Sequence, residues 1–485
     1  MSTSIQRTTA GTGGSTPRTG GPKIVIIGAG SAVFGQRAIS AILRSEVLKG
    51  TELHLVDTDP EPLQLMADLA ETMNRAWGSE ATIRATGDRR QALPDADFVI
   101  LSVQVGPREE VWEKDWRIPL EHGIRQPYAE NSGPGGLAHT ARNLPLIVDI
   151  ARDMEELCPD ALMMNYVNPM IRLTDVVERY TKIKVVGMCH QLRWGYAMAM
   201  AILGDRYGIE VPKDVKIDTN HQTRHFREPL MAAGLKHLDI KAAGINHFSW
   251  ILDIRDRETG EDLYPELRDR WNRGIPRGDF EPLSKEMFDI FGLMPTPSDS
   301  HLCEFLPWVS DPATKPWERY NLHTQSWSGN HDRRAVRREL AQKIVNGEEP
   351  VDQLRNLRSE AVPEVIEGVW ANRNIYIDQL NLRNDGLIPN LPADAIVEVP
   401  GMSTGAGVKG LGMGELPEPI AELCRRELAY SRLVTDASYH GDRDAMLQAL
   451  LFDPTVTDVQ TAKEVLDHLL TEFAEYLPQF ERPQR

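Results

Sequence analysis

The stretch KIVIIGAGSAVFG, residues 23–35, decides the fold expected of this 485-residue chain. Its first residues, Lys23–Ile27, form a short apolar and β-branched run of the kind that makes a strand buried on both faces. Gly28 and Gly30 then permit a tight turn, and apolar residues at helical spacing follow from Ser31. Phosphate oxygens bind the free backbone N–H groups in the first turn of such a helix. The stretch therefore predicts the opening βα unit of a nucleotide-binding sheet.

The segments that follow continue the succession of strands and helices. TELHLVDTD, DADFVILSV, DALMMNYVNP and IKVVGMCH are apolar runs that predict four more strands. This order is typical of a doubly wound, parallel sheet. We therefore expect an α/β protein whose residues 23–200 form a Rossmann-type domain like that of the lactate and malate dehydrogenases.

The glycine turn and the acid after the second strand indicate NAD. Asp57 ends that strand, somewhat beyond the usual distance of about 20 residues at which an acid holds the adenine ribose hydroxyls. A carboxylate there repels the 2′-phosphate of NADP, so we assign Gly28, Gly30, Ser31 and Asp57 to NAD. The third glycine of the usual motif is displaced to Gly35, and a Rossmann-like scaffold without a ligand is the alternative.

Composition and charge restrict the partners and the compartment. The formal net charge of −17 argues against nucleic acid as a partner. Four cysteines without paired spacing are typical of a reducing compartment, and no stretch approaches the roughly 20 apolar residues of a membrane span. Residues 1–22 are rich in Ser, Thr and Gly and lack the apolar core of a signal peptide, which predicts a disordered tail on a cytoplasmic protein.

Polar residues stand where two of the later strands are expected to end. Asn168 follows one strand, and Cys189 and His190 follow the next. Ligands of open α/β sheets lie beyond the carboxyl ends of the strands, so we expect these side chains near the nicotinamide. By itself the Cys–His pair fits a nucleophile with its base, a metal site or two core residues. A single His247 in the apolar run DIKAAGINHFSWILDI is by itself more often a hydrogen-bonded core residue than a ligand.

Several blocks in one order resemble family 4 of the glycoside hydrolases. They are GAGS after the first strand, ENSGPGG at 130–136 followed by Arg142, NPM at 168–170, GMCH at 187–190, GINH at 244–247 and NDGLIPNLPADAIVEVP at 384–400. The resemblance runs from about Lys23 to beyond Pro454, so it covers nearly all of the chain that we expect to be ordered.

The resemblance implies an NAD-dependent, metal-assisted glycosidase. NAD takes hydride from C3 of the sugar, the ketone acidifies the C2 hydrogen, the aglycone is eliminated, water adds, and the hydride returns to C3. The metal polarises the C2 and C3 oxygens as a Lewis acid. By motif, Cys189 and His247 are its ligands. Manganese is the expected ion, with cobalt, nickel or iron as substitutes, although a Cys–His pair alone suggests zinc or iron.

The same resemblance implies roles for further residues. His190, next to the metal cysteine, is the expected acid that protonates the leaving oxygen. Histidine at this position is typical of the branch that acts on unphosphorylated α-glycosides, and a surface neighbour without a role is the alternative. The residues assigned to the substrate are Asn168, Arg142 and Asn246.

The base that removes the C2 proton is left open between two residues. The phosphoglycoside branch uses a tyrosine, but the corresponding segment here, GLMPTPSDSHLCEFLPW, contains none. Asp299 and His301 are the candidates, because a carboxylate and an imidazole can both take a proton from an acidified carbon. His301 and Glu304 resemble the pattern of the α-galactosidase and α-galacturonidase-like members.

These inferences together predict a glycosidase that acts on an unphosphorylated α-linked hexoside or hexuronide. We expect residues 201–485 to form an α+β domain for substrate and metal, and the chain to form a homodimer or homotetramer as the family does. The main alternative is an NAD-dependent 2-hydroxyacid dehydrogenase of the lactate and malate type, whose fold the first half also fits. A non-catalytic NAD sensor is the third possibility.

Overall fold

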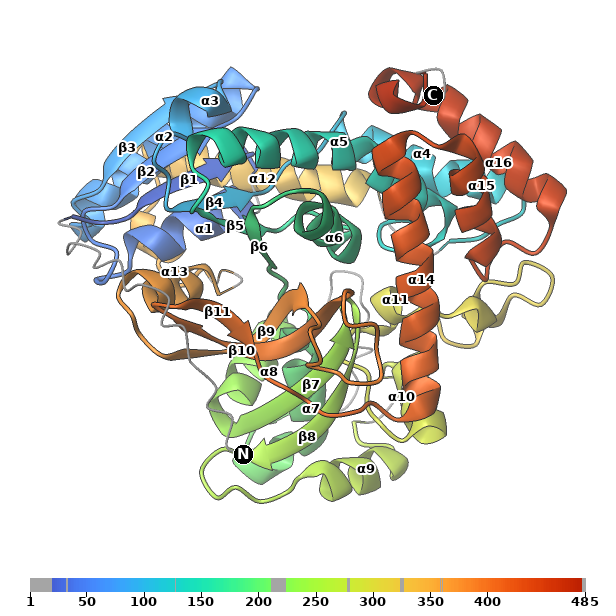
Figure 1. Cartoon of the computed structure of the whole chain (residues 1–485). Coiled ribbons are helices and arrows are strands. Elements are labelled where there is room, and N and C mark those ends of the chain that lie inside the picture. The colour runs from blue at the N-terminus through green and yellow to red at the C-terminus, as the bar shows by residue number, and fades with distance from the viewer. Residues whose placement is uncertain are drawn as a thin grey trace, which may run out of the picture.

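The computed structural model places one large sheet at the centre of the molecule, with helices on both faces (Figure 1). It describes residues 20–31, 34–126, 128–210, 224–276, 280–322, 327–357, 359 and 361–481. Residues 1–19 of the predicted N-terminal tail lie outside the described residues. No helix in the described ranges has the length and apolar character needed to cross a membrane.

The first half of the chain forms the predicted Rossmann-type sheet. Its strands are β1 (Lys23–Ile27), β2 (Glu52–Val56), β3 (Thr82–Thr86), β4 (Phe98–Leu101), β5 (Leu162–Asn165) and β6 (Lys184–Gly187). They are parallel and lie in the order β3-β2-β1-β4-β5-β6. This is the order of a doubly wound dinucleotide-binding fold, so the fold predicted for this half is confirmed.

The apolar run of β1 is buried on both faces because helices cover each side of the sheet. Ile24 and Ile26 belong to the core under α1 (Phe34–Leu43) and α2 (Pro60–Trp77). Val25 and Ile27 belong to the opposite core under α5 (Gly133–Leu157) and α6 (Met170–Tyr180). Burial of each such side chain contributes roughly 1.5–3 kcal/mol to folding.

The second half continues the same sheet with antiparallel strands. These are β7 (Leu238–Ile245), β8 (Phe248–Asp256), β9 (Ile375–Arg383), β10 (Ile396–Thr404) and β11 (Gly407–Gly410). They extend the sheet beyond β6 in the order β9-β10-β7-β8, with β11 beside β10. The halves of the chain are therefore joined through their strands.

The helices of the second half pack mainly around β7 and β8. Apart from α13 (Val362–Trp370), which packs against β9, β10 and α1, they are α8 (Arg224–His237), α9 (Tyr264–Asn272), α10 (Pro282–Phe291) and α11 (Asp299–Leu302). α7 (Leu192–Leu203) belongs to this group, because it packs against α8 and α9 and shares their core. The domain boundary predicted after residue 200 therefore falls inside a helix of the second half.

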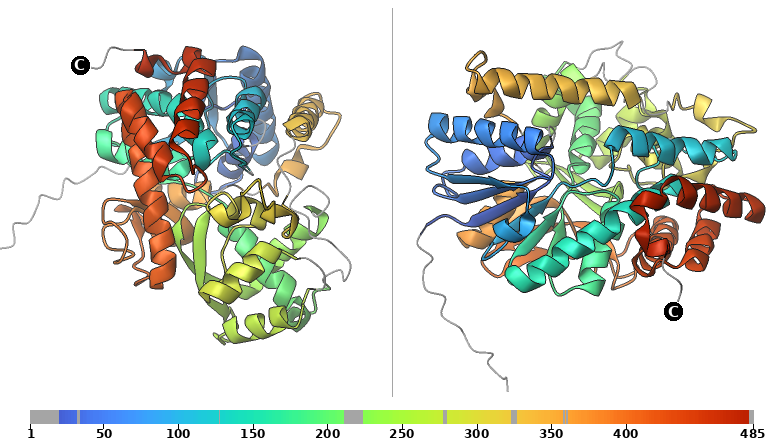
Figure 2. Two further views of the ribbon diagram at one scale, coloured as in Figure 1. Left: turned by 90° about the vertical axis from the view of Figure 1, so that its right-hand side faces the viewer. Right: turned by 90° about the horizontal axis from the view of Figure 1, so that it is seen from above.

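Four helices from the second half of the sequence return to the first half. α14 (Glu418–His440) lies against α5 and α6, and α15 (Arg443–Phe452) and α16 (Val459–Glu472) follow beside it (Figures 1 and 2). α16 also contacts α4 (Arg108–Glu121), and α12 (Trp327–Val345) lies along α2 and reaches α4. The remaining helical segments are α3 (Arg89–Ala92) and short turns at Gly204–Tyr207, Pro307–Val309, Pro316–Glu318, Val351–Leu354, Ala474–Tyr476 and Pro478–Phe480.

Candidate active site

A row of four paired residues crosses the sheet where its two halves join. Gly187 pairs with Asn381, Asn381 with Glu398, and Glu398 with Gly244. Gly187 is the last residue of β6, and Gly244 is the last but one of β7. The segments that follow these two strands therefore start beside one another, although a long stretch of sequence separates them.

Cys189 and His247 meet beside this row. Cys189 follows β6, and His247 lies in the two-residue turn between β7 and β8 with a φ of 59°. The Sγ atom of Cys189 lies 3.3 Å from Nε2 of His247. Two ligands of one ion stand about this far apart, since metal–sulfur and metal–nitrogen bonds are about 2.3 and 2.1 Å long. The structure thus brings together the pair that the sequence motif predicted.

The other ring nitrogen of His247 is held by an amide. Nδ1 lies 3.0 Å from Nδ2 of Asn131, which comes from the loop before α5. The imidazole is buried, and burial lowers its pKa well below the ordinary value, with the neighbouring His301 and His190 adding to the shift. The ring is therefore neutral, which is the state that binds a metal. With the amide N–H donating to Nδ1, the ring proton lies on Nε2, so metal binding through Nε2 would place this proton on Nδ1 and turn the amide oxygen of Asn131 towards it.

Glu130 and His301 join His247 in a cluster that could hold a metal ion. One ligand atom of each residue lies within 4.8 Å of the others. Glu130 is buried, and its carboxylate lies 3.7 Å from the guanidinium of Arg108. Carboxylate oxygens suit harder ions such as Mn²⁺, which a Cys–His pair alone does not. No role was predicted for Glu130 from the sequence, although this residue opens the ENSGPGG block.

His301 is oriented by a buried carboxylate. Its Nδ1 lies 3.0 Å from Oε1 of Glu304, and its ring centroid is 4.6 Å from that of His247. Glu304 also accepts a hydrogen bond from the backbone N–H of Asn131 at 2.9 Å. A proton on Nδ1 that faces Glu304 leaves Nε2 of His301 as a proton acceptor. Of the two predicted bases, His301 is thus the one that lies against the metal-type cluster.

Asp299 is used by a neighbouring helix instead. One carboxylate oxygen accepts from the backbone N–H of Leu283 at 2.8 Å, and the other accepts from the backbone N–H and Oγ of Ser284, both at 2.7 Å. These contacts cap the first turn of α10. Burial raises the pKa of the Asp299 carboxyl, while the same hydrogen bonds lower it. The structure therefore gives Asp299 a capping role in place of the predicted catalytic one.

Tyr128 lies on the other side of His301 and was not anticipated. The two ring centroids are 4.7 Å apart, and Nε1 of Trp112 donates to the carbonyl oxygen of Tyr128 at 2.9 Å. Burial raises the pKa of the phenol well above its usual value, and the nearby Glu130 and Glu304 add to this. The phenol is therefore a hydrogen-bond donor at neutral pH. No pattern in the sequence marks Tyr128, because its position depends on a loop.

A cavity of about 700 Å³ begins at the glycine turn and reaches this cluster. It is lined by Gly28, Ser31 and Asp57 at one end and by Asn168 and Glu130 at the other. Gly28 has a φ of 86°, and a Cβ there would lie 2.3 Å from the carbonyl oxygen of Ser102. Only glycine fits this approach of two backbones.

Asp57 closes the end of the cavity at the glycine turn. Its Oδ2 accepts from the backbone N–H of Gly30 at 2.8 Å, and a Cβ on Gly30 would meet the same oxygen. All four residues predicted to bind NAD therefore lie together at the carboxyl ends of β1 and β2.

The predicted residues Asn168, Cys189 and His190 line two different cavities. Asn168 lines the large cavity, and its Oδ1 atom is buried without a hydrogen-bond partner among the described residues. Cys189 and His190 line a second cavity of about 110 Å³ with Arg193 and Asp378. The thiol of Cys189 thus lies at the second cavity and contacts His247, which clusters with Glu130 of the large cavity.

Asn246 is tied to the sheet that carries it. Its Nδ2 donates to Oε2 of Glu398 at 2.8 Å, and its Oδ1 is buried without a partner among the described residues. Glu398 also accepts from Oγ of Ser249 at 2.7 Å. The amide thus fixes the β7–β8 turn, and only its oxygen is left for the predicted contact with substrate.

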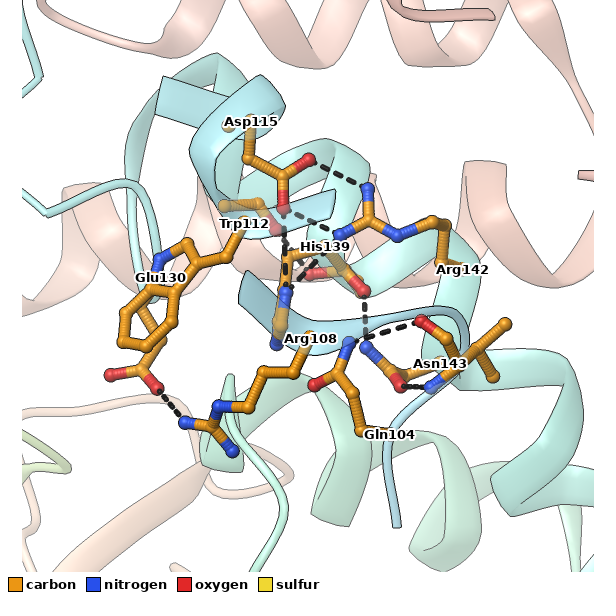
Figure 3. A network of polar contacts seen from close by, with 12 residues as sticks. Gln104, Arg108, Trp112, Asp115, Glu130, His139, Arg142 and Asn143 are labelled. Atoms are coloured by element: carbon orange, nitrogen blue, oxygen red, sulfur yellow. Dashed lines mark hydrogen bonds and ion pairs between the residues drawn. The ribbon is translucent and has the colours of Figure 1, made fainter. Parts of the chain in front are cut away.

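Arg142 is buried behind the cavity wall, where its contacts differ from the predicted ones. Its Nη1 and Nη2 donate to the two carboxylate oxygens of Asp115 at 2.6 and 2.5 Å (Figure 3), and its guanidinium lies over the ring of Phe473. Both ends of the guanidinium are therefore used inside the protein. At the next residue, Oδ1 of Asn143 accepts from the backbone N–H of Val105 at 2.9 Å. Arg142 thus holds α4 and α5 around the loop after β4.

Comparison with known proteins agrees with this geometry. The model described as "Family 4 glycosyl hydrolase" matches residues 23–205, and that of the family's C-terminal domain matches residues 242–456. An α-galactosidase of Bacillus subtilis (strain 168) is 30% identical over 470 residues, which cover 94% of this chain and 99% of that protein.

Two solved structures have the same fold. A crystal structure from Bacillus subtilis that is described as a glucosidase has a TM-score of 0.79 at 27% identity, and the match covers 93% of this chain and 100% of that one. A 6-phospho-β-glucosidase from Thermotoga maritima, solved with manganese, NAD⁺ and glucose-6-phosphate, has a TM-score of 0.74 at 21% identity, over 94% and 99% of the chains. At that identity the second likeness concerns the fold alone.

Proposed function

The chain belongs to family 4 of the glycosyl hydrolases and is a glycosidase, and from this premise we propose that it uses NAD and a divalent metal to hydrolyse an unphosphorylated α-glycoside. The observation that carries the proposal is the convergence of Cys189 and His247, at 3.3 Å, beside a cavity that starts at a dinucleotide-type glycine turn. A hydroxy-acid dehydrogenase has no use for a thiolate and an imidazole placed to share an ion. The proposal therefore replaces that alternative.

The residues present fit both groups. Gly28, Gly30, Ser31 and Asp57 would hold NAD, since the turn has no side chain in the way and Asp57 lines the cavity. When bound, NAD would accept and later return a hydride at C3 of the sugar, and the metal would polarise the C2 and C3 oxygens.

Three side chains would supply the donor set for the metal. Cys189 and His247, which are in contact, would offer sulfur and nitrogen, and Glu130, which clusters with His247 and His301, would offer a carboxylate oxygen. The carboxylate resolves the apparent mismatch between a Cys–His pair and manganese, because oxygen ligands suit that ion. We therefore propose Mn²⁺, with cobalt, nickel or iron as substitutes.

Proton transfer would be divided between two histidines. His301, held through Nδ1 by Glu304, would take the C2 proton on Nε2. His190, next to Cys189, would protonate the oxygen of the departing aglycone. Asn168, with its unpartnered Oδ1 in the cavity wall, would accept a hydrogen bond from a sugar hydroxyl.

The sugar is an unphosphorylated hexoside or hexuronide. The α-galactosidase and the glucosidase among the relatives act on different hexoses by name, so the stereochemistry at C4 stays open between them. His190 after the metal cysteine, as in the branch that acts on unphosphorylated α-glycosides, supports this class over sugar 6-phosphates. We further propose a cytoplasmic homodimer or homotetramer, as the family resemblance implies.

A panel of aryl α-glycosides tests the proposal. Neutral, uronic and 6-phosphorylated glycosides would be assayed with catalytic amounts of NAD and Mn²⁺ under reducing conditions. We expect release of the phenol from a neutral or uronic α-glycoside, dependence on both additives, and a primary isotope effect with substrate deuterated at C2 or C3. Stoichiometric accumulation of NADH without phenol release would overturn the proposal in favour of a dehydrogenase.

A further inference from the structure

Two arginines from distant parts of the sequence line the large cavity beside the glycine turn. Arg108 opens α4, and Arg334 lies on α12. Both line the cavity together with Gly28, Ser31 and Gly106. Neither has a role in the glycosidase chemistry described above, although the sequence offers the pair Arg333 and Arg334 as a candidate cation for a substrate carboxylate.

Arg334 reaches the cavity because α12 crosses over the nucleotide-binding half. α12 comes from the second half of the sequence but lies along α2 and reaches α4 (Figure 2). Nε2 of Gln36 on α1 lies 3.5 Å from the carbonyl oxygen of Arg337. This contact joins α12 to the helix that follows the glycine turn. Arg334, one turn before Arg337, is thereby held over the part of the cavity that the turn lines.

The positive charge gathered here is only partly compensated by the protein. Arg334 pairs with Glu109 at 2.9 Å, and Arg108 lies 3.7 Å from Glu130, while Nε of Arg108 is buried without a hydrogen-bond partner in the described part of the chain. Burial lowers the pKa of Arg334 to about 10, and repulsion from Arg108 adds to the shift. Guanidinium groups held close together and partly desolvated are stabilised when an anion lies between them.

We propose that Arg108 and Arg334 form a clamp for the pyrophosphate of the dinucleotide. The clamp rests on the proposed use of NAD. The backbone N–H groups of the glycine turn would meet one side of the phosphates, and the two guanidinium groups would meet the other. A carboxylate of a uronic substrate has similar chemistry. Both arginines line the same cavity as Gly28 and Ser31, and Gln36 ties α12 to the helix after the turn, which favours the phosphates because that turn is the phosphate-binding part of the fold.

The clamp also gives α12 a function. Without it, this helix would only pack along α2 and against α4 and α1. With it, NAD binding would connect α12 to the glycine turn through the ligand, so that the two halves of the chain are fastened together when the dinucleotide is bound.

Binding of nucleotide fragments to the full chain tests the clamp. ADP-ribose contains the pyrophosphate, and adenosine does not. We expect Arg334→Gln to weaken ADP-ribose binding roughly 10- to 100-fold, as loss of a charged hydrogen-bonding group does, and to leave adenosine binding unchanged. Arg334→Lys keeps the charge but loses the paired N–H donors of the guanidinium. Its affinity for ADP-ribose should therefore lie between those of Arg334→Gln and the unchanged protein. Isothermal titration calorimetry measures all three affinities.

Arg338→Gln is the matched control, because Arg338 is an exposed arginine one turn further along α12. It should bind ADP-ribose as the unchanged protein does, with the same melting temperature as Arg334→Gln. Equal ADP-ribose affinity in Arg334→Gln and the unchanged protein would overturn the clamp while leaving the use of NAD intact. Failure of the unchanged protein to bind ADP-ribose would instead refute the proposed cofactor.

The substrate carboxylate has its own arm of the experiment. At saturating NAD, the KM of a hexuronide and that of the matching neutral glycoside would be compared in Arg334→Gln. The clamp predicts that the ratio of the two KM values stays as in the unchanged protein. A selective rise in the KM of the hexuronide, with ADP-ribose affinity unaffected, would assign the arginines to the substrate and reject the clamp.

Discussion

Two features of His247, its backbone conformation and the burial of its ring, are each energetically unfavourable. Its φ of 59° lies in the left-handed region, which a residue with a Cβ enters only at an energetic penalty. Its imidazole is also buried, and burial lowers its pKa well below the ordinary value. Both costs are accounted for if the neutral ring must present Nε2 to the thiol of Cys189, which lies 3.3 Å away. The strained backbone of His247 therefore marks the position of the proposed metal site.

The first prediction concerns these two ligands. Cys189→Ser and His247→Ala should each weaken Mn²⁺ binding by more than the roughly 10- to 100-fold loss typical of residues that only orient a ligand. Each variant removes one donor atom directly, and turnover should fall with the affinity. Electron paramagnetic resonance of free Mn²⁺, titrated with protein and NAD, measures the binding without relying on activity.

Cys424→Ser is the matched control for the thiol. Cys424 is fully buried in an apolar core on α14, and it belongs neither to the metal-type cluster nor to the lining of the large cavity. It should bind Mn²⁺ as the unchanged protein does. Unaltered Mn²⁺ affinity in Cys189→Ser would refute the assignment of that thiol as a ligand.

The second prediction separates positioning from metal binding. Glu304→Gln should lower kcat roughly 10- to 100-fold, because His301 loses the carboxylate that orients its Nδ1. Mn²⁺ affinity should change far less, since Glu304 is outside the proposed ligand set. The primary isotope effect of C2-deuterated substrate should rise as proton removal becomes slower. An unchanged isotope effect with lowered kcat would assign Glu304 to another step.

Residue types alone could not have distinguished these roles. Asp299 and His301 were equal candidates in the sequence, and only the structure shows that the carboxylate caps α10 while the imidazole lies against His247. Arg142 likewise looked available for a substrate, yet Asp115 occupies its guanidinium. The choice depends on which partners a side chain meets after folding, and local sequence does not specify these partners.

At the scale of elements, the row from Gly187 to Gly244 is what makes the site. β6 and β7 lie on either side of β9 and β10, which come much later in the chain. The sequence indicated β6 and β7 by their apolar runs. It did not indicate their order, because pairing between distant strands depends on the packing of the whole sheet. The link between Cys189 and His247 was therefore predictable only from the family resemblance.

The third prediction tests this row. Gly187→Ala should destabilise the protein by about 1–3 kcal/mol and lower Mn²⁺ affinity. Its Cβ would lie 2.8 Å from Cβ of Asn381 and 2.8 Å from Sδ of Met170, so β9 must move away from β6. Gly412→Ala is the control, since nothing lies within 4 Å of its added Cβ. Chemical unfolding and Mn²⁺ titration should give a lower free energy of unfolding and a lower Mn²⁺ affinity for Gly187→Ala than for Gly412→Ala. Equal free energies of unfolding would show that the row tolerates a shift of β9.

The fourth prediction concerns the contact between α6 and α14. Glu427 on α14 is buried, and its Oε1 lies 3.4 Å from Nη2 of Arg172 on α6. Burial raises the pKa of Glu427 from 4.5 to about 7, and Arg172 opposes the shift. Since the folded-state pKa is the higher one, the stabilising contribution of this carboxyl is complete below about pH 4.5 and is lost as the pH rises towards 7.

Glu427→Gln should remove this pH dependence. Between pH 5 and 8 the free energy of unfolding of the variant should therefore gain on that of the unchanged protein, by at most about 3 kcal/mol. Glu418→Gln, an exposed change on the same helix, should follow the unchanged protein. Parallel stability curves for Glu427→Gln and the unchanged protein would show that the carboxyl is ionised throughout this range.

At the scale of the whole molecule, the prediction of two successive domains describes the chain only in part. The Rossmann-type half was predictable because each of its strands is a local apolar run beside a helical pattern. The return of α12 and α14 to that half was not predictable. Their apolar residues specify that a face is buried but not which surface covers it. The continuous sheet and the shared helices make the two halves parts of one structure.

This interdependence leads to the last prediction, that residues 20–205 do not fold alone. α14, α15 and α16 cover a core that includes Val111, Ile118 and Leu137 of the first half, and β6 would lose its neighbour β9. The isolated segment would expose this apolar surface and an unpaired strand edge. We expect it to bind a hydrophobic dye and to show no cooperative thermal transition, whereas the full chain unfolds cooperatively. Addition of residues 206–481 as a separate chain should restore ADP-ribose binding if both parts are needed. A cooperative thermal transition together with ADP-ribose binding in the isolated segment would instead show that the first half is an independent domain.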